Sequence, residues 1–277
     1  MASTMMKSAN RLKVAFDEAK GPSMGCWQMI PGSNVSRTLA RTGVDWVVVD
    51  CEHGNMDDAA MHQAVPAIAA CGVSPIVRIP DNQGWMVKRA LDSGAHGVIV
   101  PLLYTVEDAK KLVNSVKFPP QGQRGFGSPF PMERFHPDLS SADYLQQAND
   151  VILTMAQIET KEALDSVEAI AAVPGIDVLF VGPFDLGNNI GHPIINGVMH
   201  DELHAAIKKT LDAANKAGKK AAIFCTSGEQ SKKYADDGFH MISVATDTLI
   251  LQASVMGALS TAKGLGPGPK LNGPYGK

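Results

Sequence analysis

Short apolar runs alternate with longer amphipathic runs along most of the chain. The short runs are rich in Val and Ile and nearly continuous in apolar character, as expected of parallel strands that are covered on both faces. Eight are predicted as strands, over residues 24–28, 45–50, 75–78, 97–101, 151–158, 177–182, 221–224 and 240–244.

Helical patterns lie between these runs, over residues 35–41, 57–70, 83–93, 106–116, 161–172, 200–217, 228–237 and 247–262. Most end at a glycine, the residue that best adopts a left-handed C-cap, namely Gly43, Gly72, Gly94, Gly175, Gly218 and Gly238. Eight β/α units predict a (β/α)8 TIM barrel, formed as one domain by residues 1–263. No Gly-x-Gly-x-x-Gly motif follows the first strand, which removes the main argument for a doubly wound dinucleotide fold.

Three segments fall outside this alternation. Residues 8–16 are predicted as a capped amphipathic helix of the fold, although the basic N-terminal segment weakly resembles a mitochondrial targeting sequence. Residues 264–277 are rich in Gly and Pro, so we expect a tail or an intersubunit arm. The connection from residue 118 to residue 150, with a short helix over 142–149, is too long for a simple βα link. We expect it to form one wall of the site or to pack on a neighbouring subunit.

Composition narrows the class of protein. With 277 residues, of which 45% are hydrophobic and 19% charged, the chain can bury one large core. The net charge of −3 gives no reason to expect nucleic acid or an anionic membrane as a partner, and no apolar run is long enough to span a bilayer. The cysteines show no metal-ligand spacing, so we expect buried thiols in a reducing compartment, the cytoplasm, at Cys26, Cys51, Cys71 and Cys225.

Polar side chains stand where several of the predicted strands end. In parallel α/β folds the carboxyl ends of the strands meet at one edge, and this edge carries the chemistry. We therefore expect an active site built from the residues that follow the second, third, fifth and sixth strands, which are Asp50, Glu52, His53, Arg78, Glu159 and Asp185.

Glu159 and Asp185 follow consecutive strands, so their carboxylates can converge on one ion. Two carboxylates, several waters and a chelating substrate are the usual environment of a hard cation such as Mg²⁺ or Mn²⁺. The alternative is that each carboxylate caps a helix or pairs with a surface lysine. Their position on consecutive strands favours the metal.

His53 and Arg78 are the candidates for proton transfer and charge stabilisation. A histidine titrates near neutrality, so beside a carboxylate it can act as a general base. Arg78 offers fixed donors to an enolate oxygen or a carboxylate, but an ion pair with Asp50 that serves only the fold is an equal alternative.

Asp92 ends a predicted helix, where a negative charge is unfavourable for the helix dipole, so we expect either a specific partner or a solvated surface position.

These motifs resemble the HpcH/HpaI aldolase family. The resemblance runs from about residue 12 to residue 263 and is carried by residues 45–53, 77–78, 91–95, 157–160 and 182–186, in that order. Members of the family are metal-dependent class II pyruvate aldolases, such as 4-hydroxy-2-oxoheptanedioate aldolase, with a phosphoenolpyruvate/pyruvate-type barrel. They usually form hexamers in which the last helix packs on a neighbour, so the resemblance implies a homo-oligomer.

The resemblance also implies a role for each site residue and a divalent metal, Mg²⁺, Mn²⁺ or Co²⁺, as the cofactor. The implied roles are His53 as the base, Asp92 as the group that raises its basicity, Arg78 as the enolate stabiliser, Glu159 and Asp185 as metal ligands, and Gln157 with the backbone N–H of Phe184 as contacts to the 2-oxo acid. The implied reaction is the reversible aldol cleavage of a 4-hydroxy-2-oxo acid to pyruvate and an aldehyde. His53, directly or through a water on the metal, would take the 4-hydroxyl proton, and no Schiff-base lysine is needed.

Alternatives to this function remain at this point. Residues 126–130 also resemble a segment of macrophomate synthase, a family member that forms the same enolate by decarboxylating oxaloacetate. The chain departs from the usual family pattern at Gly187, often a serine, and at the amides Asn188 and Asn189, which leaves the aldehyde open. A citrate-lyase-like enzyme would need a basic patch for coenzyme A beyond Lys88-Arg89, and a non-catalytic barrel would not need the site residues.

Overall fold

Eight parallel strands close into a barrel in the computed structural model, which describes residues 5–266. The strands follow one another around the barrel in sequence order, with β8 pairing back to β1. This confirms the predicted TIM barrel, and every predicted strand is present with ends that differ by two residues at most. The strands are β1 (Ser23–Gln28), β2 (Trp46–Asp50), β3 (Ser74–Arg78), β4 (Gly97–Val100), β5 (Leu153–Ile158), β6 (Val178–Val181), β7 (Lys220–Ile223) and β8 (Met241–Thr246).

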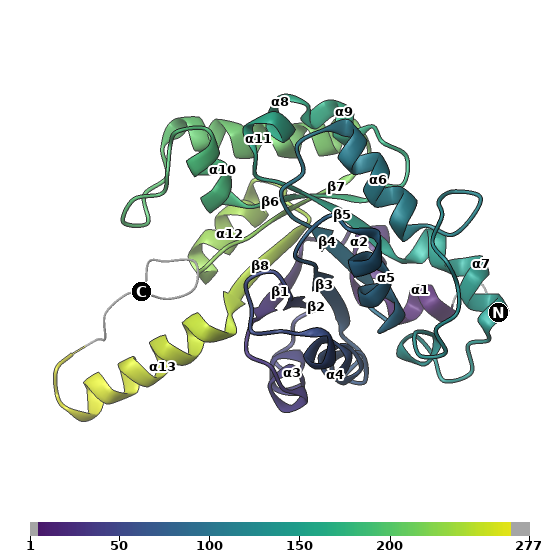
Figure 1. Cartoon of the computed structure of the whole chain (residues 1–277). Helices are drawn as coiled ribbons and strands as arrows, with labels where there is room; N and C mark the ends of the chain where they lie inside the picture. Colours follow the sequence, from purple (N-terminus) through teal and green to yellow (C-terminus); the bar gives the residue numbers. More distant parts are fainter. Residues whose placement is uncertain (1–4, 267–277) are drawn as a thin grey trace.

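Helices surround the barrel (Figure 1). They are α1 (Met5–Ala9), α2 (Arg11–Glu18), α3 (Ser33–Ala40), α4 (Asp58–Ala69), α5 (Gly84–Asp92), α6 (Val106–Val116), α7 (Ser141–Val151), α8 (Lys161–Asp165), α9 (Val167–Ala171), α10 (Pro183–Asn189), α11 (Asp201–Lys216), α12 (Gly228–Asp236), α13 (Asp247–Ala262) and the short 3₁₀ helix η2 (Met132–Arg134). All six glycines predicted to end helices have positive φ. Among the helices after β1, two details differ from the prediction: the helix expected over 161–172 breaks at Ser166, and α10 was not expected as a helix.

Two hydrophobic cores follow from the alternation of side chains along each strand. One set of side chains points outward and packs under the helices. The other set fills the barrel interior, where Trp46, Val48, Ile76 and Phe180 are fully or almost fully buried. Gly25 lies beside Trp46 in the register of β1 and β2, and a Cβ at this glycine would lie 2.0 Å from the indole ring. The absence of a side chain at Gly25 therefore makes room for a large ring inside the barrel.

The inward-pointing positions change from apolar to polar at the carboxyl ends of the strands. On β2 the inward face runs from Trp46 and Val48 to Asp50, and on β3 it ends at Arg78. On β5 the same alternation carries Gln157, and then Glu159 just after the strand, onto the interior face. The polar residues singled out in the sequence thus enter the barrel mouth because they continue the buried face of their strands.

The opposite end of the barrel is closed by α2. Leu12 and Phe16 of this helix join the interior core, and the helix is capped by Asn10, whose side chain accepts a hydrogen bond from the backbone N–H of Lys13. The single helix predicted over residues 8–16 is therefore two helices, α1 and α2, joined at Asn10. The Asn10 amide also donates to the backbone oxygens of His96 and Val151, at 3.0 and 2.9 Å. Asn10 therefore ties the N-terminal segment to the start of the barrel strands.

His96 lies in this closed end and gives the fold a pH-dependent stability. Its ring stacks on Phe135 with 4.2 Å between centroids, and complete burial lowers its pKa to about 4. The native state therefore holds the ring neutral, whereas the unfolded state protonates it near pH 6.5. The stabilisation is complete above pH 6.5 and is lost as the pH falls towards 4, by on the order of 3 kcal/mol.

We expect His96→Gln, which cannot titrate, to lose less stability than the wild-type protein between pH 6.5 and 4. Urea denaturation at several pH values measures the difference in unfolding free energy, and comparison with the wild type removes the contribution of other titrating groups. His136→Gln, at a more exposed histidine, is the control and should keep the wild-type slope. Equal slopes for wild type and His96→Gln would contradict the buried neutral ring.

The long connection between α6 and β5 packs at the same closed end. Arg124 is buried there, with its guanidinium 4.5 Å from the ring centroid of Phe118, and it donates to Asp92 Oδ1 and the Tyr144 hydroxyl, both at 3.1 Å. The connection therefore covers α5 and α7 near the start of the strands. None of the residues 118–150 lines the cavity at the strand ends, so the connection forms no wall of it within one chain, and packing on a neighbouring subunit stays a prediction.

The last helix, α13, projects away from the barrel (Figure 1). Of its residues only Asp247 and Leu249 are buried, whereas Ile250, Leu251, Val255 and Leu259 are about half exposed or more. Such an apolar helix outside the core is typical of an interaction surface. Of the predicted C-terminal tail, residues 267–277 lie outside the described part of the chain. Within residues 5–266, no helix is both long and apolar enough to cross a membrane.

Candidate active site

A cavity of about 310 Å³ opens at the carboxyl ends of the strands. It brings together residues of the second, third, fifth and sixth β/α units with Trp27 of β1 and Phe224, which follows β7. The residues that line it are Trp27, His53, Arg78, Gln157, Glu159, Phe180, Gly182, Pro183, Phe184, Asp185, Asn188 and Phe224. Five of the predicted site side chains therefore face one space: His53, Arg78, Gln157, Glu159 and Asp185.

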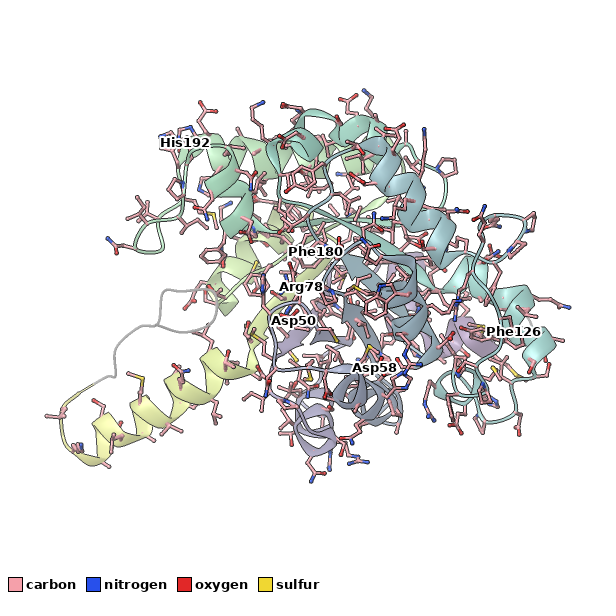
Figure 2. All side chains as sticks on the ribbon, viewed as in Figure 1. Asp50, Asp58, Arg78, Phe126, Phe180 and His192 are labelled. Atoms are coloured by element: carbon pink, nitrogen blue, oxygen red, sulfur yellow. The ribbon has the colours of Figure 1, made fainter. Side chains whose placement is uncertain are left out.

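Asp50 and Arg78 form the rigid base of this site (Figure 2). The Arg78 guanidinium donates through Nε to Asp50 Oδ1 at 2.9 Å and through Nη2 to Asp50 Oδ2 at 2.6 Å. Asp50 is fully buried and also accepts from Trp27 Nε1 at 3.1 Å. Arg78 is therefore paired with Asp50 and also lines the cavity, and its role towards a substrate stays a prediction. The pair fixes the plane of the guanidinium before any substrate binds.

The same carboxylate shapes the loop that carries His53. Asp50 Oδ1 accepts hydrogen bonds from the backbone N–H groups of Glu52 and His53, at 3.1 and 3.3 Å. Glu52 then lies between the two cationic candidates, with Oε2 at 2.9 Å from Arg78 Nη1 and Oε1 at 3.5 Å from His53 Nε2. Burial raises the pKa of Glu52 to about 7, although the nearby Arg78 opposes this shift. The ring of His53 is half exposed and lines the cavity.

Glu159 is held almost completely buried at the end of β5. Its Oε1 accepts from the backbone N–H of Leu102 at 2.8 Å, and its Oε2 accepts from Gln157 Nε2 at 2.5 Å. Burial raises the pKa of Glu159 to about 7, and the negative charges of Asp185 and Glu52 add to this effect. The side-chain oxygen of Gln157, Oε1, is buried without a hydrogen-bond partner among the described residues. It can therefore accept a hydrogen bond from a ligand.

Gly182 makes room for these two side chains. A Cβ at this position would lie 2.4 Å from Glu159 Oε2 and 2.9 Å from Gln157 Nε2. A glycine at the end of β6 therefore allows the carboxylate and the amide to approach the chain that leads into α10. Any larger residue would displace one or both of them.

Asp185 and Phe184 come from the first turn of α10. Backbone N–H groups in the first turn of a helix have no acceptor within the helix, so that of Phe184 is available to a negatively charged oxygen. Asp185 is exposed to the cavity and faces the buried Glu159 closely enough for the two charges to repel. This turn follows β6 directly, so the position of Asp185 is set by the barrel rather than by a mobile loop.

Glu159 and Asp185 fit a divalent cation. Among residues 5–266, no group of three or more His, Cys, Asp or Glu side chains is arranged to hold a metal ion by itself. Two carboxylates completed by water and a chelating substrate match the oxygen ligands of Mg²⁺ or Mn²⁺. A cation between them would also offset the repulsion by Asp185 that adds to the effect of burial on the pKa of Glu159. The donor set therefore fits a metal that binds together with its substrate.

Sequence reasoning missed the aromatic wall of the cavity. Trp27 packs against Phe180 and Phe224, with 5.5 and 5.1 Å between ring centroids, and lies under the Arg78 guanidinium at 5.1 Å. Phe184 extends this wall at 6.5 Å from Phe224. A signal was available, because Trp27 and Phe180 are aromatic residues near the carboxyl ends of strands, as are the polar residues. Figure 2 shows Phe180 close to Arg78.

Asp92 is not brought together with the other predicted residues. It ends α5, which runs back along the barrel, and its carboxylate accepts from Arg124 Nη2 at 3.1 Å. His53 lies at the opposite end of the barrel, so the predicted contact that raises its basicity does not form within one chain. The carboxylate beside the His53 ring is that of Glu52.

Comparison with known proteins places the chain in a family. Residues 24–253 match the model of the family described as HpcH/HpaI aldolase/citrate lyase. The chain belongs to this family. The match spans every strand from β2 to β8 and all the cavity-lining residues, and it confirms the resemblance seen in the sequence motifs.

Several HpcH/HpaI relatives are similar over nearly their whole length. The hydroxypyruvate/pyruvate aldolase of Chromohalobacter salexigens is 35% identical over 94% of this chain and 100% of its own. The 5-keto-4-deoxy-D-glucarate aldolase of Shigella boydii is 31% identical over 92% of this chain and 96% of its own. Among solved structures, macrophomate synthase superposes with a TM-score of 0.81 and 28% identity, over 94% of this chain and 91% of its own. HpcH/HpaI proteins are lyases that generally use a divalent metal.

Proposed function

We propose that this protein is a metal-dependent aldolase that reversibly cleaves a 4-hydroxy-2-oxo acid to pyruvate and an aldehyde. The observation that carries the proposal is the convergence of His53, Arg78, Gln157, Glu159 and Asp185 on one cavity at the barrel mouth. The names of the curated relatives support aldol chemistry on pyruvate-type donors.

Arg78 and Gln157 bind and orient the 2-oxo acid in this mechanism. Asp50 fixes the guanidinium of Arg78, so its donors meet the ketone oxygen in a set geometry as negative charge develops there. The backbone N–H of Phe184 donates to the carboxylate end of the substrate, and so does the Nε2 hydrogen of Gln157 that is not used towards Glu159. The aromatic wall formed by Trp27 and Phe224 excludes water from part of the cavity, and Trp27 packs against the Arg78 guanidinium.

His53 moves the proton. In the cleavage direction its ring takes the proton of the 4-hydroxyl group, directly or through water, while the bond between C3 and C4 breaks. The electrons of that bond form the enolate of pyruvate, whose oxygen faces Arg78. Glu52 stabilises the imidazolium that results, because its carboxylate lies 3.5 Å from His53 Nε2.

Glu159 and Asp185 would hold the divalent cation. When bound, Mg²⁺, Mn²⁺ or Co²⁺ acts as a Lewis acid that polarises the ketone of the substrate. A lysine Schiff base, the alternative way to polarise a ketone, finds no support, because none of the described residues that line the cavity is a lysine.

Removal of the metal is expected to abolish activity. Since two carboxylates are the proposed ligands, exhaustive treatment with EDTA should reduce aldol cleavage to background, and added Mn²⁺, Mg²⁺ or Co²⁺ should restore it. A coupled assay of pyruvate release measures both steps, with circular dichroism as a control for folding. Full activity after chelation, or covalent trapping of substrate by borohydride, would contradict the proposal.

The decarboxylation of oxaloacetate is a second candidate reaction, favoured by the similarity to macrophomate synthase. It would use the same cavity, because loss of CO₂ from oxaloacetate yields the same pyruvate enolate. Residues 126–130, which carried the resemblance to that enzyme, lie at the closed end of the barrel, and none of them lines the cavity. They therefore do not bear on the choice between the two reactions.

We also propose that the protein is a homo-oligomer, a hexamer by family resemblance. The half-exposed apolar side chains of α13 support this assembly, because a second copy would bury them. Light scattering measures the mass, and a monomer at micromolar concentration would contradict it.

The four cysteines are all free, which supports a reducing compartment such as the cytoplasm. The expectation that all four are buried is correct for Cys26 and Cys225 and wrong for Cys51 and Cys71, which are partly exposed.

A further inference from the structure

We propose that Asp247 is a positioning residue for catalysis, because it holds the loop that carries His53 through the backbone of Met29. This inference rests on the aldolase activity proposed above, in which His53 moves the proton. It gives a role to a buried carboxylate that the mechanism does not use. It is carried by the hydrogen bonds that join the start of α13, the end of β1 and residues 51–55.

Asp247 is a buried carboxylate at the carboxyl end of β8. The helix α13 follows this strand without an intervening residue, so Asp247 is the first residue of the helix and also stands at the edge of the barrel that holds the active site (Figure 1). It does not line the cavity. A buried carboxylate is costly unless its oxygens accept hydrogen bonds, so its partners show what it holds in place.

Backbone N–H groups occupy both carboxylate oxygens of Asp247. The N–H of Met29 lies 3.1 Å from Oδ1 and 3.0 Å from Oδ2, and the N–H of Ile30 donates to Oδ2 at 2.9 Å. The N–H of Thr248, in the first turn of α13, donates to Oδ1 at 2.7 Å. Hydrogen bonds to a charged acceptor are stronger than neutral ones. Asp247 therefore fixes the chain as it leaves β1, which ends at residue 28.

The backbone of Met29 in turn supports the loop of His53. Its carbonyl oxygen accepts a hydrogen bond from the backbone N–H of Asn55 at 3.0 Å. A Cβ at Gly54 would lie 3.1 Å from the Cα of Met29 and 2.3 Å from the backbone oxygen of Asp50, so the loop packs closely on both. The side chain of Asp50 holds the start of this loop, and Met29 holds its end. His53 lies between these two attachments, so the position of its ring depends on both.

Asp247→Asn tests the inference in the full-length protein. A carboxamide of the same size keeps one acceptor but places an amino group where one oxygen accepts from Met29 or Ile30. We expect kcat for aldol cleavage to fall by about ten- to a hundredfold, the effect of displacing a catalytic group by about 1 Å. KM for the 2-oxo acid should change by less than about threefold, because its binding groups do not contact Asp247. An unchanged kcat would overturn the inference.

A double-mutant cycle with His53→Ala separates positioning from a general loss of structure. If Asp247 acts through His53, its replacement has little left to disturb once the ring is absent. Asp247→Asn should then change the residual kcat of His53→Ala by less than about twofold. A structural effect that is independent of His53 would repeat the full loss in both backgrounds, and this result would overturn the inference.

Asp177→Asn is the matched control. The Oδ2 atom of Asp177 accepts from the backbone N–H of Thr154 at 2.8 Å, so this carboxylate also supports the backbone of a strand, but at the closed end of the barrel. Its replacement should leave kcat at the wild-type value. Amide hydrogen exchange of residues 51–55, followed by mass spectrometry, should be faster in Asp247→Asn and unchanged in Asp177→Asn. Equal exchange in the two variants would contradict the role of Asp247.

Gly54→Ala is a second variant, and it decides the matter if Asp247→Asn does not fold. Its methyl group should move the loop away from Met29. We expect a loss of kcat that is again absent in the His53→Ala background. An unchanged kcat in Gly54→Ala would show that the contact with Met29 does not position His53, and would overturn the inference.

Deuterium exchange of the pyruvate methyl group separates this inference from the proposed function. If the wild-type protein exchanges pyruvate and Asp247→Asn keeps the wild-type kcat, only the positioning role is refuted. A wild-type protein that does not exchange pyruvate refutes the aldolase assignment and this inference together.

Discussion

Replacement of His53 by alanine is expected to slow aldol cleavage by about 10²- to 10⁴-fold, the usual contribution of a positioned general base. The ring lines the cavity beside Glu52 and is half exposed, so its loss removes proton transfer without opening the core. Steady-state kcat on a 4-hydroxy-2-oxo acid measures the effect. Circular dichroism and Mn²⁺ binding should match those of the wild-type protein.

His204→Ala provides the control for this experiment. His204 lies on α11, outside the cavity lining, and its variant should keep wild-type kcat. If both variants, His53→Ala and His204→Ala, keep near-wild-type turnover, another group must take the proton of the 4-hydroxyl group. The assignment of His53 as the base would then be wrong.

Replacement of Arg78 by lysine is expected to lower kcat far more than it raises KM. The fork of Arg78 is fixed by two hydrogen bonds to Asp50, and an ammonium group cannot reproduce its geometry towards an enolate oxygen. The loss should appear together in aldol cleavage, pyruvate proton exchange and any oxaloacetate decarboxylation, because all three pass through one enolate. Kinetics of the three reactions on one preparation measure it.

Stability must be measured beside these rates. The Arg78–Asp50 pair is buried, so its disruption should also reduce the unfolding free energy by a few kcal/mol. Arg89→Lys is a matched control, because Arg89 donates two hydrogen bonds to the carboxylate of Asp58, as Arg78 does to Asp50. The Arg89–Asp58 pair is exposed and distant from the cavity. It should change neither kcat nor stability by much. A rise in KM alone for Arg78→Lys, with kcat intact in all three reactions, would make Arg78 a binding residue only.

The strands could be predicted because their burial leaves a local signal. A strand covered on both faces needs an almost continuous apolar run, and polar residues such as Arg78 and Glu159 interrupt that run only where the strand leaves the core. The site could be predicted for the same reason, since inward-pointing positions continue to the barrel mouth. The family motifs then gave each of these residues a role that spacing alone left open.

Features that depend on long-range packing could not be predicted. Asn10 caps α2, and its side chain donates hydrogen bonds to the backbone oxygens of residues 96 and 151. No local sequence pattern predicts these contacts. The direction of α5 places Asp92 at the far end of the barrel from His53, although both belong to the same motif set. The aromatic wall that includes Trp27 is a different case: its position at a strand end was a signal, but aromatic residues there usually indicate core packing.

Local chemistry misled the prediction in two places. Residues 183–189 contain Pro183 and Gly187 and were not expected to form a helix, yet proline suits the first turn and the glycine packs against the backbone of His192. The connection after α6 has the length of a functional loop. Its buried Arg124 ties it instead to Asp92 and Tyr144 at the closed end of the barrel.

The most direct test of the account is the exchange of pyruvate methyl protons in D₂O, followed by ¹H NMR with and without Mg²⁺ or Mn²⁺. The exchange requires only formation of the enolate, so it examines Arg78, Glu159, Asp185 and the metal without knowledge of the aldehyde. The account predicts loss of the methyl signal in the presence of protein and metal, and none after EDTA treatment. A methyl signal that persists with metal-loaded wild-type protein would contradict the assignment of this cavity as a pyruvate enolate site.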